Sequence, residues 1–275
     1  MTAVLSPIQT IWSADHVFIS PGAMSDAFLV DVAAPFLKQL DGAGDWFFIR
    51  YGEGGPHLRI RVRVEHEDVA ARIHRRWCEA APAYVDSGDV MGGVRRIAYQ
   101  PEIARYGGPQ AMPLSERAFC RSTALSLGII AATSGDMERR IGQAIGIMIA
   151  SLRSLTDDQA EIGRILRDHA AGWERWFAAV GWPVTDEAAP VALRDPATVE
   201  AALHGPAGPP RSYGAAWQAC LAALLDALQP PAPGVAGPED IVRSHLHMFC
   251  NRLGVSPATE YHLARAVGGF IQQRR

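Results

Sequence analysis

Strand-like patterns dominate the first third of the chain. The aromatic run at residues 46–51 (WFFIRY) is followed by strict alternation of polar and apolar residues at 57–64 (HLRIRVRV). The segment between them contains GEGG at 52–55, so we expect a β-hairpin with its turn there. The residue pattern predicts two further strands, at 12–20 and 92–100.

Apolar residues at helical spacing predict helices in the rest of the chain. Residues 25–40 fit a helix opened by Ser25, and residues 67–81 fit a helix with Val69, Ile73 and Trp77 on one stripe. Further helices are expected near residues 115–132, 137–154, 157–180, 195–204, 212–228, 239–252 and 257–272. The Pro/Gly-rich segments 205–210 and 230–238 are predicted loops. The fold class expected is α+β, with a small, mostly antiparallel sheet before a helix-rich part, and we expect one domain over residues 1–275.

Composition narrows the class of protein. The net charge of −3 excludes a chain that is basic throughout, so any anion site must be a local concentration of cations. No signal peptide and no apolar run of transmembrane length is found, and we expect a cytoplasmic protein with no membrane association. The four cysteines lack metal-ligand spacing and are expected to be free thiols.

The second strand of the hairpin carries a row of cationic side chains. Side chains alternate between the faces of a strand, so His57, Arg59, Arg61 and Arg63 share one face and the apolar residues share the other. A solvated polar face would explain one or two such charges. Four groups with no acid between them repel one another, which favours a site for an anion such as a carboxylate or phosphate.

Two later segments offer further polar groups. The loop YQPEIARYGGPQAM at 99–112 brings Glu102, Arg105 and Tyr106 close together, either as a local ion pair or as part of a site. In SHLHMFCNRLG at 244–254, a helix would place His247 and Asn251 on one face. His247 fits either a buried core histidine or a general acid/base.

Common catalytic signatures are absent from the sequence. There is no GxSxG, P-loop, HExxH or Rossmann glycine motif, and two histidines two residues apart on a helix do not chelate a metal. We therefore expect no metal, nucleotide or flavin cofactor. Cysteine chemistry at Cys250 is disfavoured, because this residue points away from His247.

The segments WFFIRYGEGGPHLRIRVR, YQPEIARYGGPQAM and HMFCNRLG, in this order, resemble the small C-terminal domain of class I lanthipeptide dehydratases. The same domain occurs in thiopeptide-type bacteriocin biosynthesis proteins. In that family a large domain esterifies Ser or Thr of a ribosomal precursor peptide with glutamate from glutamyl-tRNA. The small domain then eliminates glutamate to leave dehydroalanine or dehydrobutyrine.

The resemblance implies which residues act. The family's elimination residues fall here on Arg59, Arg61, Arg105 and His247, with His247 as acid/base and the arginines holding the glutamyl carboxylate and the developing negative charge. The neighbouring polar residues expected to bind substrate are Arg50, His57, Tyr106 and Asn251.

The resemblance also implies partners. Besides the precursor peptide, we expect a separate glutamylation protein that itself meets the tRNA, so that this chain contacts no nucleic acid. A homodimer is a further possibility from the full-length relatives. Two other functions stay open: a pyridine synthase that joins two dehydroalanines by a formal cycloaddition, and a non-catalytic module that binds precursor peptide.

Overall fold

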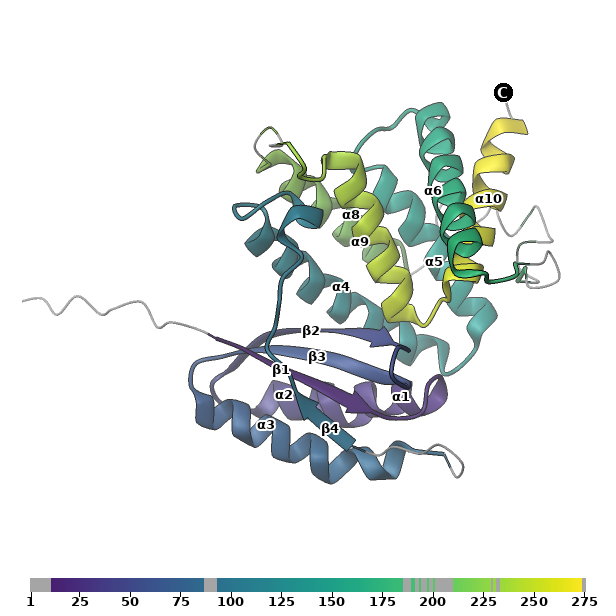
Figure 1. The fold of residues 1–275 in the computed structure, drawn as a ribbon. Coiled ribbons are helices and arrows are strands. Elements are labelled where there is room, and N and C mark those ends of the chain that lie inside the picture. The colour runs from purple at the N-terminus through teal and green to yellow at the C-terminus, as the bar shows by residue number, and fades with distance from the viewer. Residues whose placement is uncertain are drawn as a thin grey trace, which may run out of the picture. The chain divides into compact units, whose positions relative to one another are not determined.

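The computed structural model describes residues 11–86, 93–184, 210–228, 230 and 233–273, together with the single positions 189, 190, 193, 197 and 200. Backbone contacts group the chain into two compact units, Met1–Gln100 and Pro101–Arg275. The fold is α+β as predicted, with its sheet in the first unit and helices through the second (Figure 1).

In the described residues of the first unit, four strands form an antiparallel sheet in the order β2-β3-β1-β4. The strands are β1 (Ile11–Phe18), β2 (Ala43–Tyr51), β3 (His57–Val64) and β4 (Gly93–Arg96). The β2-β3 hairpin is confirmed. Its turn is closed by a hydrogen bond from the Gly55 amide to the Gly52 carbonyl, and Gly54 and Gly55 both have positive φ. β4 is shorter than the predicted strand at 92–100.

Helices cover the apolar face of this sheet. They are α1 (Ala23–Ala27), the π-helical segment Phe28–Ala33, α2 (Ala34–Gln39) and α3 (Glu67–Ala80), followed by a 3-10 turn at Ala81–Tyr84. Figure 1 shows α2 and α3 lying along the sheet. Leu58, Ile60 and Val62 of β3 are almost fully buried, so the predicted apolar face is confirmed.

The predicted helix at 25–40 differs from the structure in two ways. It begins at Ala23 after Gly22, so the prediction of Ser25 as its first residue is wrong; the Ser25 hydroxyl instead donates to the Gly22 carbonyl. Its middle turns are π-helical just before Pro35. Proline has no amide hydrogen and its ring crowds the preceding turn, and a widened turn relieves that conflict.

The second unit is helical. A 3-10 turn at Ile103–Tyr106 leads into α4 (Met112–Thr133), α5 (Met137–Leu152), α6 (Gln159–Val180), α8 (Pro210–Asp226), α9 (Pro238–Leu253) and α10 (Pro257–Gln273). These bounds lie within three residues of the predicted ones. Asp136 and Asp158 cap α5 and α6 by accepting backbone amide hydrogens. Of the predicted helix at 195–204, the structure describes only residues 197 and 200, and both are helical; most of the predicted loop at 205–210 lies outside the described residues.

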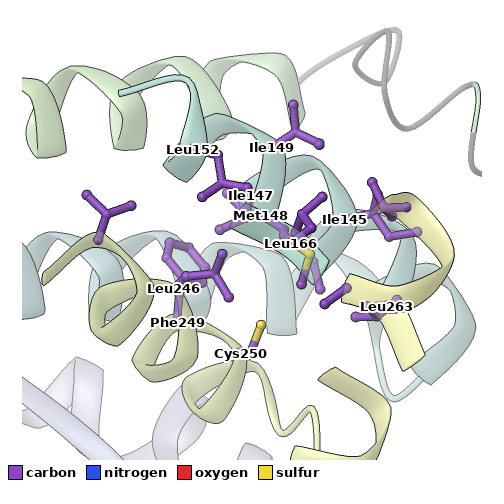
Figure 2. Packing of buried hydrophobic residues seen from close by; sticks show 14 of the residues in the cluster. Ile145, Ile147, Met148, Ile149, Leu152, Leu166, Leu246, Phe249, Cys250 and Leu263 are labelled. Atoms are coloured by element: carbon purple, nitrogen blue, oxygen red, sulfur yellow. The ribbon is translucent and has the colours of Figure 1, made fainter. Parts of the chain in front are cut away.

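The core of the second unit is built from the apolar stripes of these helices. α6 packs along α10, and α4, α5, α8 and α9 pack together. Figure 2 shows Met148 of α5, Leu166 of α6, Leu246 and Phe249 of α9 and Leu263 of α10 converging in this core. The core thus fixes α6, α9 and α10 against one another, and these helices carry the polar residues described next.

Candidate functional site

The sheet face opposite the helices gathers the predicted cationic row. The register pairs Arg59 with His16 of β1 and with Ile49 of β2, and it pairs Arg61 with Phe47. Paired residues project from the same face, so His16 of β1 and Phe47 of β2 share the face of the two arginines. Arg59 and Arg61 are half-buried there, rather than extended into solvent.

Each arginine of the row lies over an aromatic ring. The guanidinium carbon of Arg59 is 3.4 Å from the centroid of Tyr51, and that of Arg63 is 5.0 Å from Trp12. Arg61 lies 5.4 Å from Phe47 and 5.2 Å from the ring of Tyr99. Ring faces carry partial negative charge, so they steady guanidinium groups without neutralising them. At Arg59 this contact keeps the guanidinium charge available to an incoming anion.

Two histidines lie within this cationic face and are held neutral. The rings of His16 and His57 stack with centroids 4.8 Å apart. Burial, reinforced by Arg59, lowers the pKa of His16 to about 4, and burial also lowers the pKa of His57. The Arg59 Nε donates to the His57 Nε2 at 3.2 Å, and the His57 Nδ1 lies 2.8 Å from the Gly55 carbonyl. His57 therefore orients Arg59 through this hydrogen bond; its predicted contact with substrate stays a prediction.

Arg50 does not join this group. It projects from the opposite face of β2, where its guanidinium pairs with Asp26 at 2.6 Å and donates to the Ser25 hydroxyl at 2.5 Å. This ion pair ties β2 to α1 below the sheet. The contacts favour a structural role for Arg50, and substrate binding by Arg50 has no support in its position.

Arg105 and Tyr106 occupy the 3-10 turn before α4. The Arg105 guanidinium pairs with Glu102 at 3.1 Å and donates to the Ser244 hydroxyl of α9 at 3.2 Å. Tyr106 is buried against Phe119, so its ring supports the turn. The local Glu102–Arg105 pair considered from the sequence is present, and Ser244 additionally connects it to the helix of His247.

Glycine fixes this turn. Gly107 has φ of 89°, and a Cβ atom there would lie 2.8 Å from the Cβ of Ala111. Only glycine fits both the backbone conformation and the space. The turn therefore has a fixed shape, which places the Arg105 guanidinium against Ser244 of α9.

His247 lies one turn after Ser244 on α9 and is partly exposed. Its Nδ1 is 2.9 Å from Oε2 of Glu260, a residue of α10 that is completely buried. The other oxygen of Glu260 lies 2.7 Å from Nε2 of His169 on α6. The ring edge of Trp173 packs against His247 with centroids 5.0 Å apart. Asn251 lies one turn further along α9 and is half-buried.

Three residues of this region, Glu260, His169 and His16, were not predicted from the sequence. Glu260 and His169 are 13 and 78 positions from His247 in a helical region, and helical periodicity does not report which helices touch. His16 was missed because its strand has no cationic pattern of its own. A signal was present for Glu260, since a carboxylate two residues before His262 interrupts the apolar stripe of α10.

The structure gives little support for chemistry at a cysteine thiol. Cys250 is buried in the core of Figure 2, and burial raises the pKa of its thiol well above the usual range. All four cysteines are free. In the described part of the chain, no group of three or more His, Cys, Asp or Glu side chains could hold a metal ion. The expectation of no cofactor stays a prediction.

Comparison with known proteins identifies the family. Residues 12–270 match the family described as "Lantibiotic biosynthesis dehydratase C-term". The chain belongs to this family. Epidermin biosynthesis protein EpiB of Staphylococcus epidermidis is 27% identical over 124 residues, which are 43% of this chain and 12% of EpiB. Membership of this family confirms the resemblance that the sequence motifs indicated.

Solved structures share the fold. The tRNA-dependent lantibiotic dehydratase MibB from Microbispora sp. 107891 matches the whole chain with a TM-score of 0.61 and 24% identity, over 29% of MibB. The pyridine synthase TbtD from thiomuracin biosynthesis matches 96% of the chain and 98% of TbtD, with a TM-score of 0.69 and 15% identity. TsrL matches 97% of the chain and 99% of its own length, at a TM-score of 0.56 and 19% identity.

The chain spans about 12% of EpiB and 29% of MibB. The neighbours include both a dehydratase and a pyridine synthase, so fold alone does not choose between the two reactions. In the described ranges, no helix combines the length and the hydrophobicity that crossing a bilayer requires.

Proposed function

We propose that this chain eliminates glutamate from glutamylated Ser or Thr residues of a ribosomal precursor peptide. It is a lyase that leaves dehydroalanine or dehydrobutyrine and works with a separate glutamylation protein. The observation that carries the proposal is Arg59, which is half-buried on an aromatic ring and oriented by a neutral histidine. It forms no ion pair with a carboxylate of the described residues. A prepared cation of this kind suits a carboxylate-bearing leaving group.

The reaction needs a base, and His247 is the candidate. Its Nδ1 is engaged by Glu260, and its Nε2 has no hydrogen-bond partner among the residues that the structure describes. In the proposed step, Nε2 takes the Cα proton of the esterified residue. The electrons of the Cα–H bond delocalise onto the neighbouring carbonyl and then form the Cα=Cβ double bond. As they do so, the Cβ–O bond breaks, and glutamate leaves as a carboxylate with the electron pair of the Cβ–O bond.

Arginines handle the negative charge in this step. Arg59 and Arg61 on the sheet face hold the glutamyl leaving group, and Arg105 stabilises the charge that develops on the substrate carbonyl as the proton leaves. His57 acts through Arg59, Tyr106 supports the turn that carries Arg105, and Asn251 lies one helical turn from His247 on α9. Glutamyl-tRNA meets the partner protein rather than this chain, in keeping with the net charge of −3.

A second candidate function is pyridine synthesis from two dehydroalanines. It is favoured by the likeness to TbtD, which this chain matches over nearly the full length of both proteins. A cycloaddition of that kind has no carboxylate leaving group, and so it gives no reason for the row of Arg59 and Arg61. A non-catalytic peptide-binding module is the third alternative, and it gives no reason for a partly exposed His247 joined to a buried carboxylate.

The test is mass spectrometry on two synthetic precursor peptides, one with a glutamyl ester on Ser and one with two dehydroalanines. We expect the first to lose glutamate and become lighter than the unmodified peptide by one water. His247→Ala should slow this loss by about 10²- to 10⁴-fold, the usual contribution of a general base. An ester that survives while the second peptide gains a six-membered nitrogen ring would establish the pyridine synthase. If neither peptide changes, the binding module is favoured.

A further inference from the structure

Helices α6, α9 and α10 bring three titratable side chains together. The buried carboxylate of Glu260 lies between two imidazoles, 2.9 Å from Nδ1 of His247 and 2.7 Å from Nε2 of His169. The Glu260 side chain is 0% exposed, that of His169 is 8% exposed, and that of His247 is 21% exposed. A polar trio in a helical core is costly to bury unless each member is paired. His247 is the most exposed of the three.

The charge of Glu260 determines where the imidazole protons lie. Burial alone would raise the pKa of Glu260, but His247 and the hydrogen bond from His169 outweigh it and lower that pKa to about 2. Glu260 is therefore ionised near neutral pH. An ionised carboxylate only accepts hydrogen bonds, so both facing nitrogens must carry hydrogens.

This requirement selects one form of each ring. His247 must be protonated on Nδ1, which leaves Nε2 with a lone pair when the ring is neutral. Nε2 is then the atom that can take a proton. His169 must be protonated on Nε2, and its bond holds the second oxygen of Glu260 so that the carboxylate cannot rotate away from His247. Trp173 packs against both imidazoles, with centroids 6.2 Å from His169 and 5.0 Å from His247, and limits their rotation.

We propose that Glu260, anchored by His169, is a positioning residue that holds His247 in the tautomer with a basic Nε2. The proposal rests on the proposed function in taking His247 as the base, but the tautomer itself is a property of the free protein. The roles of the two residues match those in other His–carboxylate pairs, in which the carboxylate orients the ring and does not touch the reacting atoms.

The first test reads the tautomer without any substrate. Long-range ¹H–¹⁵N correlation spectra of ¹⁵N-labelled protein distinguish a protonated from an unprotonated ring nitrogen, at a pH where the imidazoles are neutral. The signals of His247 are identified by their loss in His247→Gln. We expect Nδ1 protonated in the wild type and a shift toward the Nε2-protonated form in Glu260→Gln. A wild-type ring that is protonated on Nε2 would overturn the proposal.

The second test follows elimination from the glutamylated peptide. Glu260→Gln should lower kcat by about 10²- to 10⁴-fold with little change in KM, as in other pairs that lose the orienting carboxylate. Glu174→Gln is the matched control, because Glu174 also lies at the α6–α10 contact but accepts a hydrogen bond from the Tyr261 hydroxyl and, among the described residues, from no imidazole. It should retain wild-type kcat.

His169 offers a test that does not depend on the folding of Glu260→Gln. Gln at 169 keeps a donor near the position of Nε2, whereas Leu has none. His169→Gln should keep most of the wild-type kcat and the Nδ1-protonated form of His247, and His169→Leu should lose both. Equal behaviour of the two variants would contradict anchoring by His169. A wild-type ring in the expected tautomer, without any glutamate release, would refute the proposed reaction while leaving the role of Glu260 standing.

Discussion

The guanidinium carbon of Arg59 lies 3.4 Å from the centre of the Tyr51 ring, across the β2-β3 pair. This contact is supported by a hydrogen bond from Arg59 to His57 on the same strand. The arginine therefore keeps one orientation while it retains its charge. Its position on a rigid sheet, with two neighbouring contacts, is what a site for an anionic group requires.

The Tyr51 ring should matter more than its hydroxyl group. Tyr51→Leu removes the surface on which Arg59 rests, and we expect KM for the glutamylated peptide to rise about 3- to 30-fold, the range that a cation–π contact supports. Tyr51→Phe keeps the ring and should resemble the wild type. Steady-state kinetics of glutamate release measure both, and similar losses in the two variants would assign the effect to the hydroxyl.

Arg50 should contribute to stability through α1. Its pair with Asp26 is about 85% removed from solvent on both sides. Arg50→Ala removes the guanidinium that pairs with the largely buried Asp26 and should lower the free energy of unfolding by about 2–4 kcal/mol, near the cost of breaking a buried pair. Urea denaturation measures this change. Glu161→Gln breaks an exposed contact with Arg164 and, as control, should cost less than about 1 kcal/mol.

A stable Arg50→Ala protein that binds the glutamylated peptide poorly would reverse this conclusion. It would return Arg50 to the substrate-binding residues predicted from the sequence.

The stability of the first unit should depend on pH through His16. Its folded pKa of about 4 is below the ordinary value of 6.5, so between these values the unfolded chain binds more protons than the folded one. The stability from neutral His16 is therefore present above pH 6.5 and is lost as the pH falls toward 4. Urea denaturation from pH 7 to pH 4 should show this loss, and His16→Gln should reduce the slope. An unchanged slope would mean that His16 is not held neutral.

Gly107 should tolerate no side chain. In Gly107→Ala, the new Cβ requires a left-handed backbone and lies 2.8 Å from the Cβ of Ala111, so we expect the free energy of unfolding to fall by about 2–4 kcal/mol. Elimination should also weaken, because Arg105 is displaced. Gly135→Ala is the control, since Gly135 has φ of 84° and nothing within 4 Å of its Cβ position. Its free energy of unfolding should fall by about 1 kcal/mol, the cost of the left-handed backbone conformation alone. Equal losses in urea denaturation would show that the contact with Ala111 is relieved at no cost.

Periodicity predicted the elements well, because each pattern reports a local property. The alternation in β3 correctly separated Leu58, Ile60 and Val62 from the arginines, and the helices of the second unit lie near their predicted bounds. The π-helical turns before Pro35 were not predicted, since the apolar spacing there fits an ordinary helix. Arg50 was grouped with the cations because composition reports nearness in sequence, whereas strand register decides the face.

Periodic patterns could not predict the contacts between helices that bring the site residues together. The sequence marked His247 through its polar neighbours on one helix. The carboxylate that interrupts the apolar stripe of α10 was a signal for Glu260, but spacing did not indicate that Glu260 would face His247 or that His169 of α6 would contact it. Such pairs depend on how three amphipathic helices pack, and that information lies in side-chain shape rather than in spacing.

Recognition of the glutamyl leaving group by Arg59 and Arg61 can be tested by comparing two esters. Elimination rates are measured on one peptide carrying either a glutamyl or an acetyl ester on the same Ser, with wild type, Arg59→Ala and Arg61→Ala. We predict that the wild type strongly prefers the glutamyl ester, and that each variant loses that preference while its rate on the acetyl ester changes little. A preference that survives in both variants, or that is absent from the wild type, would contradict the account.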